Sequence, residues 1–254
     1  MENKNDEERI SILKSIIVMR HGERIDCVDS KSSNQLLAEY DPELTEKGIK
    51  QAKDIANQLI KSLKKEINTL NIYLSPFTRT LMTGLNIVKK LNLENNNIFI
   101  VNDLFEVCTE FNFKYFPLSS LLINNKTEKK DLYQKFINRY LDNIKNNSNG
   151  MEIFKEKSVL KFPETFPEAI NRYKNIADKL YNEICNNANN SLNIIVTHGY
   201  GVQIITEKLF GKTKNEQELL AKEDFFVDYC TSYCFNFLNE KEIKFIGRID
   251  PSFD

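Results

Sequence analysis

The stretch Ser15-Ile-Ile-Val-Met-Arg20-His21-Gly22 decides the fold that the sequence predicts. Its apolar half has the length of a buried strand, and it ends directly before a cation and an imidazole. A second apolar stretch, Leu192–Thr197, ends in the same way on His198-Gly199. These are the only two histidines of the 254-residue chain. Since the carboxyl ends of parallel strands share one edge of a sheet, adjacent strands here would bring the two histidines together.

Strands and helices alternate along most of the remaining chain. Helical spacing of apolar residues predicts helices over 44–66, where Thr45 is the N-cap, and over 78–91, 167–187 and 199–209. Further strands are predicted at 71–74 and 98–101, and a closing hairpin at 232–238 and 243–247. This order predicts an α/β fold, a three-layer αβα sandwich around a mostly parallel central sheet.

Residues 102–165 interrupt the alternation. They contain clustered aromatic residues, an amphipathic helix near 128–145 and an Asn-rich stretch at 146–149. We interpret this segment as a cap region inserted over the main sheet. The polar residues 1–13 are predicted to be a flexible leader, so 14–254 form a single domain that carries the cap at about 102–165.

The composition narrows the classes of partner. Lys and Arg number 35 against 36 Asp and Glu, so the basic excess typical of nucleic-acid or acidic-membrane binding is absent. No secretory signal or membrane-length apolar run is present, and the five cysteines include no CxxC pair. We therefore expect a cytoplasmic protein with no nucleic-acid or membrane partner. Its oligomeric state stays open, with a homodimer as one option.

Four polar segments follow predicted strands and would meet at one edge of the sheet: 20–24, 75–79, 104–106 and 197–199. Their candidate functional groups are two imidazoles, three guanidiniums and the carboxylate of Glu106. Guanidinium forks match phosphate oxygens, and imidazole can accept a phosphoryl group as a nucleophile. A carboxyl group can protonate the leaving oxygen and then activate water. No cluster has metal-ligand spacing, so we expect phosphomonoester chemistry with no metal and no cofactor.

Four motifs in order resemble the histidine phosphatase superfamily, also called phosphoglycerate-mutase-like. They are Arg20-His21-Gly22, Asp41-Pro42-x-Leu44-Thr45-x-x-Gly48-x-x-Gln51-Ala52, Ser75-Pro76-x-x-Arg79-x-x-x-Thr83 and His198-Gly199. The resemblance extends from residue 15 to about 247. The Arg-His-Gly-Glu-Arg sequence at 20–24 is similar to a subgroup related to tyrosine phosphatases that also contain ubiquitin-associated and SH3 domains.

The resemblance implies that His21 is the nucleophile that carries the phosphoryl group. It also implies a phosphate pocket completed by Arg20, Arg24, Arg79 and His198. We expect His198 to be protonated beside the phosphate. Glu106 is the predicted proton donor, with Glu110 as the alternative. For Arg24 a plain charge pair with Asp26 or Asp29 stays open, and Glu23 is expected to be structural.

The leading hypothesis is a metal-independent phosphomonoester hydrolase that uses a phosphohistidine intermediate on His21. The substrate would be a phosphorylated small molecule or a phosphotyrosine-type group. One alternative is a phosphoglycerate-type mutase, whose sequences typically read Arg-His-Gly-x-Ser-x-x-Asn. Here the corresponding stretch is Glu23-Arg24-Ile25-Asp26, which breaks that pattern. The other alternative is a non-catalytic scaffold of the same fold, although both histidines and all three arginines are present.

Overall fold

A computed structural model describes residues 14–28, 41–62, 67–109, 163–186, 190–214, 227–239 and 242–252, and the backbone of 148–153. Within these residues the chain forms one seven-stranded sheet in the order β4-β3-β2-β5-β1-β6-β7. The strands are β1 (Lys14–Arg20), β2 (Thr69–Leu74), β3 (Asn95–Ile100), β4 (Ser148–Ile153), β5 (Ser191–Thr197), β6 (Ser232–Phe237) and β7 (Ile243–Ile249). The pairs from β4 to β1 are parallel, and β6 and β7 add the predicted antiparallel hairpin.

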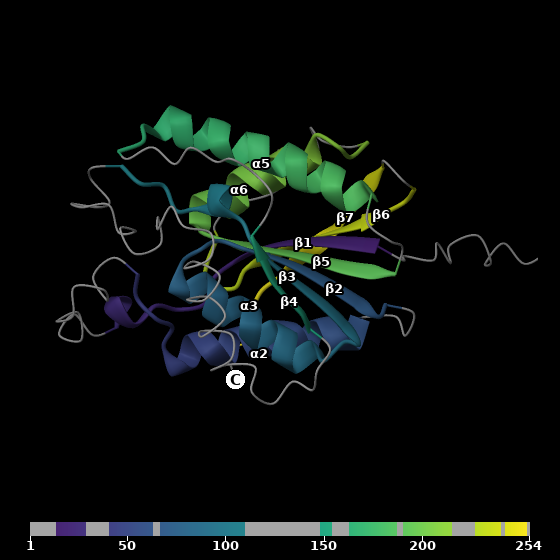
Figure 1. The fold of residues 1–254 in the computed structure, drawn as a ribbon, viewed down its shortest axis with the longest axis horizontal. Helices are drawn as coiled ribbons and strands as arrows, with labels where there is room; N and C mark the ends of the chain where they lie inside the picture. The colour runs from purple at the N-terminus through teal and green to yellow at the C-terminus, as the bar shows by residue number, and fades with distance from the viewer. Residues whose placement is uncertain are drawn as a thin grey trace, which may run out of the picture.

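Helices cover both faces of this sheet (Figure 1). On one face lie α2 (Glu46–Ser62) and α3 (Thr78–Leu91), and on the other lie α5 (Phe166–Asn186) and α6 (Gly199–Phe210). Two short 3-10 helices, η1 (Ile25–Cys27) and η2 (Asn102–Leu104), follow β1 and β3. The arrangement confirms the predicted three-layer α/β sandwich with a mostly parallel sheet.

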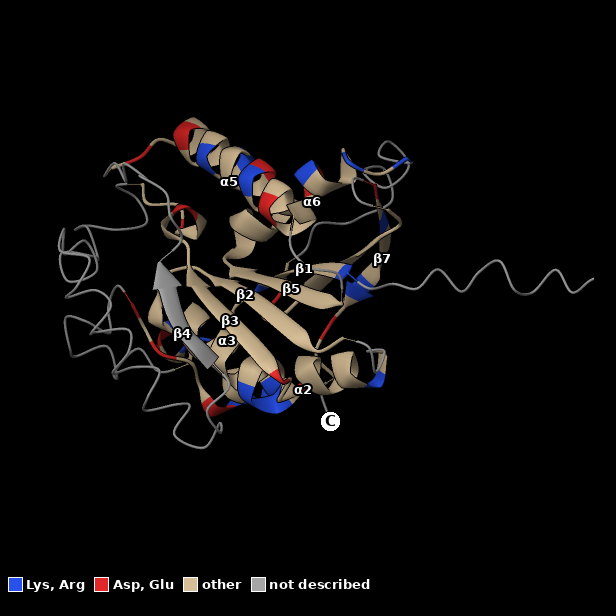
Figure 2. Ribbon diagram, turned by 45° about the vertical axis from the view of Figure 1, so that its right-hand side comes forward, with Lys and Arg blue, Asp and Glu red and all other residues tan. Residues whose placement is uncertain are grey.

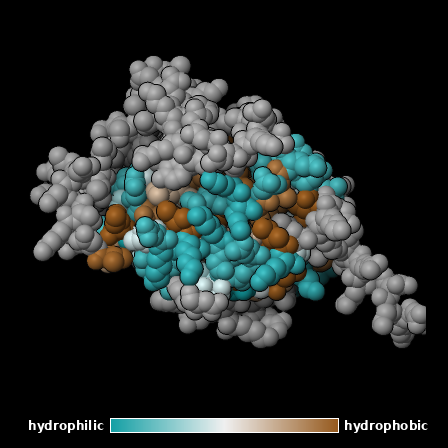
Figure 3. All heavy atoms as spheres, turned by 90° about the horizontal axis from the view of Figure 1, so that it is seen from below, coloured by the Kyte–Doolittle hydropathy of each residue, from teal (hydrophilic) through white to brown (hydrophobic). Residues whose placement is uncertain are grey.

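Each helical layer closes its own apolar core against the sheet. Ile55 and Leu59 of α2 contribute to one core, and Tyr173 and Leu180 of α5 contribute to the other. The outward surfaces are polar. Figure 2 shows both signs of charge interspersed along α5. In Figure 3, a view from the side of α2 and α3, hydrophilic atoms cover most of the described surface and leave separate hydrophobic patches. No helix in the described part of the chain is long and apolar enough to cross a membrane.

The start of α2 follows the predicted capping. Thr45 Oγ1 accepts a hydrogen bond of 2.9 Å from the backbone N–H of Gly48 in the first turn, which satisfies a donor that the helix itself leaves open. The cap fixes where the chain turns from the loop after β1 into α2. Thr45 Oγ1 also donates to Glu23 Oε2 at 2.9 Å, so this loop and the helix start are tied together.

Residues 148–153 differ from expectation. They form the edge strand β4 beside β3, whereas the sequence predicted no strand there. The segment Ser148-Asn-Gly-Met-Glu-Ile153 contains an Asn-Gly pair, which is typical of turns and hides a short edge strand from pattern analysis. The rest of the predicted cap, including the helix near 128–145, lies outside the described residues, apart from 102–109 and 163–165. The leader at 1–13 and Glu110 also lie outside them.

Candidate active site

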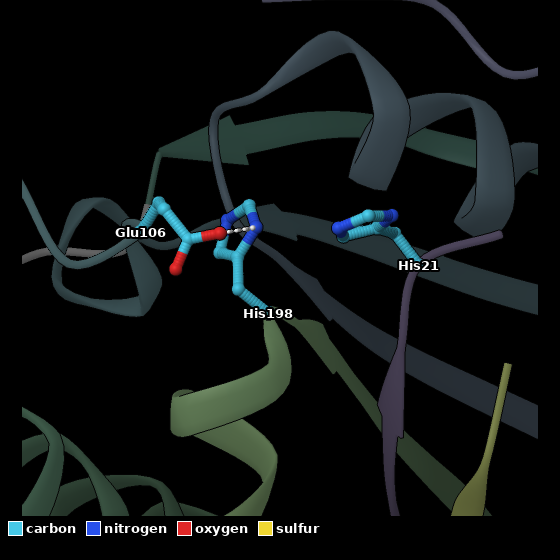
Figure 4. A group of neighbouring side chains, drawn as sticks. All are labelled: His21, Glu106 and His198. Atoms are coloured by element: carbon cyan, nitrogen blue, oxygen red, sulfur yellow. Dashed lines mark ion pairs between the residues drawn. The ribbon is translucent and has the colours of Figure 1, made fainter. Parts of the chain in front are cut away.

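The two histidines lie side by side at the carboxyl ends of neighbouring strands, as predicted. β1 pairs with β5 in a register that places Arg20 opposite Thr197, and the backbone N–H of His21 donates to the Thr197 carbonyl at 3.1 Å. The two imidazole rings are 5.3 Å apart between centroids in an edge-on arrangement. Figure 4 shows His21 at the end of β1 and His198 at the start of α6.

His21 is buried, and one of its ring nitrogens is held in place. Nδ1 lies 2.8 Å from the Gly22 carbonyl oxygen. Since a carbonyl oxygen can only accept, Nδ1 carries the proton and Nε2 keeps its lone pair. Burial, together with the charges of Arg79, His198 and Arg20, lowers the pKa of His21 well below its ordinary value. The ring is therefore neutral at physiological pH, the form in which an imidazole can act as a nucleophile.

His198 is fully buried between a hydroxyl and a carboxylate. Its Nε2 lies 2.8 Å from Ser75 Oγ, and its Nδ1 lies 3.2 Å from Glu106 Oε2. An ionised carboxylate only accepts, so Nδ1 donates to Glu106 and the Ser75 hydroxyl donates to Nε2. Burial lowers the pKa of His198 to about 4 against the opposing charge of Glu106. The ring is neutral at this pKa, because the cost of burying a charge exceeds the gain from one carboxylate neighbour, whereas the protonated state predicted from the sequence refers to a ring beside a bound phosphate.

Glu106 reaches the same pair of histidines from the loop that follows η2 (Figure 4). Its Oε2 is 3.6 Å from Arg79 Nη2, and its Oε1 accepts from the Val107 N–H at 3.1 Å. Burial alone raises the pKa of this carboxyl, but the neighbouring His198 and Arg79 and the backbone N–H outweigh it and hold the pKa well below its usual range. The group is thus a carboxylate at neutral pH.

Arg79 is the buried cation at the centre of the site. It sits in the first turn of α3 with 1% of its surface exposed, and its guanidinium lies 4.1 Å from the centroid of the Phe77 ring. Its Nη2 is 3.3 Å from His198 Nδ1, and its Nη1 is 3.6 Å from Asp41 Oδ1. Among the residues that the structure describes, Nε and Nη1 of Arg79 are buried donors that make no hydrogen bond. Unpaired buried donors on a guanidinium suit an anionic ligand with several oxygens.

Arg20 lies at the end of β1, and its guanidinium packs against the ring of Tyr229. Its Nη1 donates to the Val227 carbonyl at 2.8 Å, and its guanidinium stacks 4.2 Å from the centroid of the Tyr229 ring. Its Nε is a further buried donor that makes no hydrogen bond within the described part of the chain. Tyr229 also lies 5.8 Å from His21 between ring centroids, so it touches both residues.

Arg24 is already paired. Its Nε donates to Asp26 Oδ1 at 2.9 Å, and its Nη2 contacts the other oxygen of the same carboxylate. The charge pair that the sequence left open is therefore formed, and a phosphate would have to compete for this guanidinium. Glu23 accepts from Thr45 and from Lys47, which fits its expected structural position.

Three further residues of the site, Ser75, Asp41 and Thr83, belong to the sequence motifs, but no function was predicted for them. The Ser75 hydroxyl orients His198, as described above. Asp41 accepts from both the N–H and the hydroxyl of Thr78, at 2.8 and 2.7 Å, and so caps α3 from outside the helix. Thr83 Oγ1 accepts from the Gly22 N–H at 3.0 Å. Their position within the motifs was the available signal, but these pairings join segments far apart in the chain.

Gly22 and Gly199 have different reasons to be glycine. A Cβ on Gly22 would lie 2.5 Å from the backbone oxygen of Gly48, so α2 packs directly against this position. A Cβ on Gly199 would meet no atom nearer than 4.0 Å, at Arg20 Nε. The first glycine is required by backbone packing. The second leaves free space at the site.

The site also brings together three groups of a kind that can bind metal ions. One atom each from His21, Glu106 and His198 lies within 4.8 Å of the others. However, Arg79 places its guanidinium within 3.6 Å of both Glu106 and His198, and a divalent cation would be repelled there. The electrostatics of the site favour an anion.

Comparisons with known proteins agree with the predicted resemblance. The family model of the histidine phosphatase superfamily (branch 1) matches residues 16–108. No curated protein matches the chain in sequence.

Among solved structures, the ecdysone phosphate phosphatase of Bombix mori, determined with tungstate, is similar over 95% of both chains at 15% identity and a TM-score of 0.62. The product of an open reading frame of Mycobacterium tuberculosis is 16% identical over 94% of this chain and 97% of that one, with a TM-score of 0.45. A putative phosphohistidine phosphatase, SixA of Nakamurella multipartitia, is 10% identical over 94% of this chain and 96% of its own, with a TM-score of 0.43. The first of these shares the fold of the present chain. The chain thus carries the histidine phosphatase superfamily pattern over residues 16–108, as the motifs predicted, on the fold of a solved phosphatase.

Proposed function

We propose that this chain hydrolyses phosphate monoesters through a phosphohistidine on His21, without a metal ion. The observation that carries the proposal is the free Nε2 of a neutral, buried His21 beside guanidinium donors that make no hydrogen bond within the described residues. A phosphate dianion offers three oxygens to these donors, and the fixed cations of Arg79 and Arg20 offset its charge. The proposed substrate class is a phosphorylated small molecule or a phosphotyrosine-type group.

In the first step, Nε2 of His21 attacks phosphorus while the bond to the leaving oxygen breaks. The leaving oxygen takes a proton from Glu106, and the phosphoryl group remains on His21. Glu106 is ionised in this structure, so it must gain a proton before this step. A bound phosphate dianion supplies negative charge beside the carboxyl, which raises its pKa and favours uptake of that proton.

In the second step, water attacks the phosphorus and the bond to His21 Nε2 breaks. Glu106, now a carboxylate, accepts the proton from the attacking water. Inorganic phosphate leaves, Glu106 releases the accepted proton to solvent, and the site returns to its starting charge. Throughout, the bound phosphate favours the protonated form of His198, whose positive charge would then stabilise the transition state.

The test is hydrolysis of p-nitrophenyl phosphate by the wild-type chain, by His21→Gln and by Asp178→Asn. Asp178 of α5 pairs on the surface with Lys208 of α6 and with Lys212, which follows α6, and it serves as the control. We expect turnover that a chelator leaves unchanged, that His21→Gln reduces to background and that Asp178→Asn preserves. Acid-labile phosphate should be trapped on the wild-type chain and not on His21→Gln.

The alternatives give different results in the same experiment. A phosphoglycerate-type mutase would transfer the phosphoryl group to an added acid acceptor faster than it releases inorganic phosphate. A non-catalytic scaffold would show no turnover on any phosphate monoester. Loss of activity with a chelator, or full activity in His21→Gln, would contradict the proposed mechanism.

A further inference from the structure

Arg172, on the first half of α5, contacts the loop that carries Glu106 through both of its terminal guanidinium nitrogens. Its Nη1 donates to the carbonyls of Asp103 and Phe105 at 2.8 and 2.9 Å. Its Nη2 lies 3.3 Å from the carbonyl of Glu106 itself. A single guanidinium thus contacts three backbone oxygens, those of Asp103, Phe105 and Glu106.

Glu164 holds Arg172 in that position and also binds the loop on the C-terminal side of Glu106. Its carboxylate accepts from Arg172 Nε at 3.0 Å and from Arg172 Nη2 at 2.6 Å. The same carboxylate accepts from the Cys108 N–H at 3.0 Å, and the Glu164 N–H donates to the Cys108 carbonyl at 3.0 Å. The pair is almost completely buried, with 12% and 7% of the two side chains exposed. Residues on both sides of Glu106 are therefore anchored to one ion pair.

This anchoring replaces the hydrogen bonds that regular structure would supply. Residues 105–109 belong to neither a helix nor a strand, although Phe105 and Val107 are buried. Buried backbone groups need partners, and here side chains of the neighbouring elements provide them. Thr197 Oγ1 adds one more by donating to the Leu104 carbonyl at 2.8 Å.

We propose that Arg172 is a positioning residue that, together with Glu164, holds the Glu106 carboxyl at the distance from His198 and the leaving oxygen that proton transfer requires. This inference rests on the proposed function of Glu106 as proton donor. Proton transfer depends steeply on distance, and a displacement of about 1 Å in a catalytic group can cost ~10²-fold in rate. Arg172 itself touches neither histidine in any contact described above, so it acts through the Glu106 backbone.

A comparison of leaving groups separates positioning from plain stabilisation. p-Nitrophenolate leaves without a proton, whereas the alkoxide of an alkyl phosphate needs one in the transition state. Arg172→Lys keeps the charge and most of the side-chain length, but an ammonium cannot bridge three carbonyls and a carboxylate in the guanidinium geometry. We expect kcat/KM for the alkyl phosphate to fall by ~10²-fold and that for p-nitrophenyl phosphate to fall by less than about threefold.

Two further variants serve as controls for Arg172→Lys. Glu106→Gln should show the same selective loss, because it removes the proton donor directly. Asp178→Asn, on the same helix, should leave both substrates unchanged. If Glu106→Gln reduces both substrates equally, the proposed proton donor is wrong. If Glu106→Gln is selective but Arg172→Lys lowers both substrates equally or neither, the positioning inference is overturned while the proposed function stands.

Glu164→Gln keeps the inference testable if Arg172→Lys fails to fold. The amide oxygen can still accept from the Cys108 N–H, whereas the charge that fixes Arg172 is lost. We expect a selective loss in the same direction, by about tenfold, because the guanidinium keeps its carbonyl partners. An equal loss on both substrates, or no loss, would overturn the inference in this variant as well.

Discussion

Replacing Thr83 by valine would test how the first histidine motif is held against α3. Thr83 Oγ1 accepts a hydrogen bond of 3.0 Å from the Gly22 N–H and donates one of 2.7 Å to the Arg79 carbonyl. The hydroxyl is fully buried, and Gly22 in turn holds the Nδ1 proton of His21 through its carbonyl oxygen. Valine has nearly the same shape and removes only the hydrogen-bonding group.

The size of the effect follows from which partner is left unsatisfied. The Arg79 carbonyl lies inside α3 and keeps its helical hydrogen bond, so its loss is small. The Gly22 N–H is left buried without an acceptor, which costs about 1–3 kcal/mol. A loss of about 2 kcal/mol is a large part of the ~5–15 kcal/mol that stabilises a typical domain. In a domain of this size, it corresponds to a fall in Tm of about 4–8 °C.

The assay pairs urea unfolding with hydrolysis of p-nitrophenyl phosphate, on Thr83→Val and on Thr83→Ser. We expect Thr83→Val to lower the urea midpoint and to reduce kcat by about tenfold, because the strand end that carries His21 loses an anchor. Thr83→Ser keeps the hydroxyl and should retain full turnover with a smaller loss of stability, about 0.5–1.5 kcal/mol for a buried methyl group. A Thr83→Val chain as stable and active as the wild type would refute the reasoning.

Three further predictions follow from the same geometry. Gly22→Ala should prevent stable folding, since its Cβ would lie 2.5 Å from a backbone oxygen in the first turn of α2, whereas Gly199→Ala should retain the wild-type Tm in a thermal melt. Proton NMR should show His21 and His198 titrating below pH 6.5, the latter near pH 4, and a midpoint at or above 6.5 for either ring would contradict the burial argument. Because both folded pKa values lie below the unfolded value, the stability that these rings contribute is present above about pH 6.5 and is lost as the pH falls below it, for His198 down to about pH 4. Ser75→Ala should lower kcat and cost about 1 kcal/mol of stability in urea unfolding, since His198 Nε2 loses its donor.

The strand ends were predictable because local pattern and general topology act together there. Apolar runs at 15–19 and 192–197 are strand-sized, and parallel neighbours must end at the same edge of the sheet. The proximity of His21 and His198 follows from those two facts once the two strands are neighbours, a condition that the sequence left open and that the pairing of β1 with β5 meets. The start of α2 was equally local, since the Thr45 cap bonds to a residue three positions along. By contrast, β4 depends on pairing with β3, and no local signal in its Asn-Gly segment indicated that partner.

The contacts of Arg172 and Glu164 with the backbone around Glu106 could not be predicted from the sequence, for a different reason. Glu164 lies at the end of segment 102–165, which interrupts the strand and helix alternation, and Arg172 follows it, whereas their partners at 103–108 lie at the start of that segment. In the sequence, Glu164 stands just before an amphipathic helix and Arg172 stands on it, eight residues later. Such a pair resembles an ordinary solvent-exposed ion pair. The packing of α5 over η2 and the loop that follows it buries this pair and lets Arg172 donate hydrogen bonds to backbone carbonyls.

Charge states were the other property that sequence could not supply. The sequence predicted a proton on His198 beside a bound phosphate, and it gave no signal that burial lowers the pKa of this ring to about 4. The sequence gives only the number of acidic and basic side chains in the site, whereas the pKa of each group depends on how completely it is removed from water. In this site the permanent charge resides on Arg79, which stays protonated when buried. In the proposed function, the histidines and Glu106 therefore change protonation as phosphate binds and leaves, while the Arg79 guanidinium keeps the positive charge that attracts the phosphate.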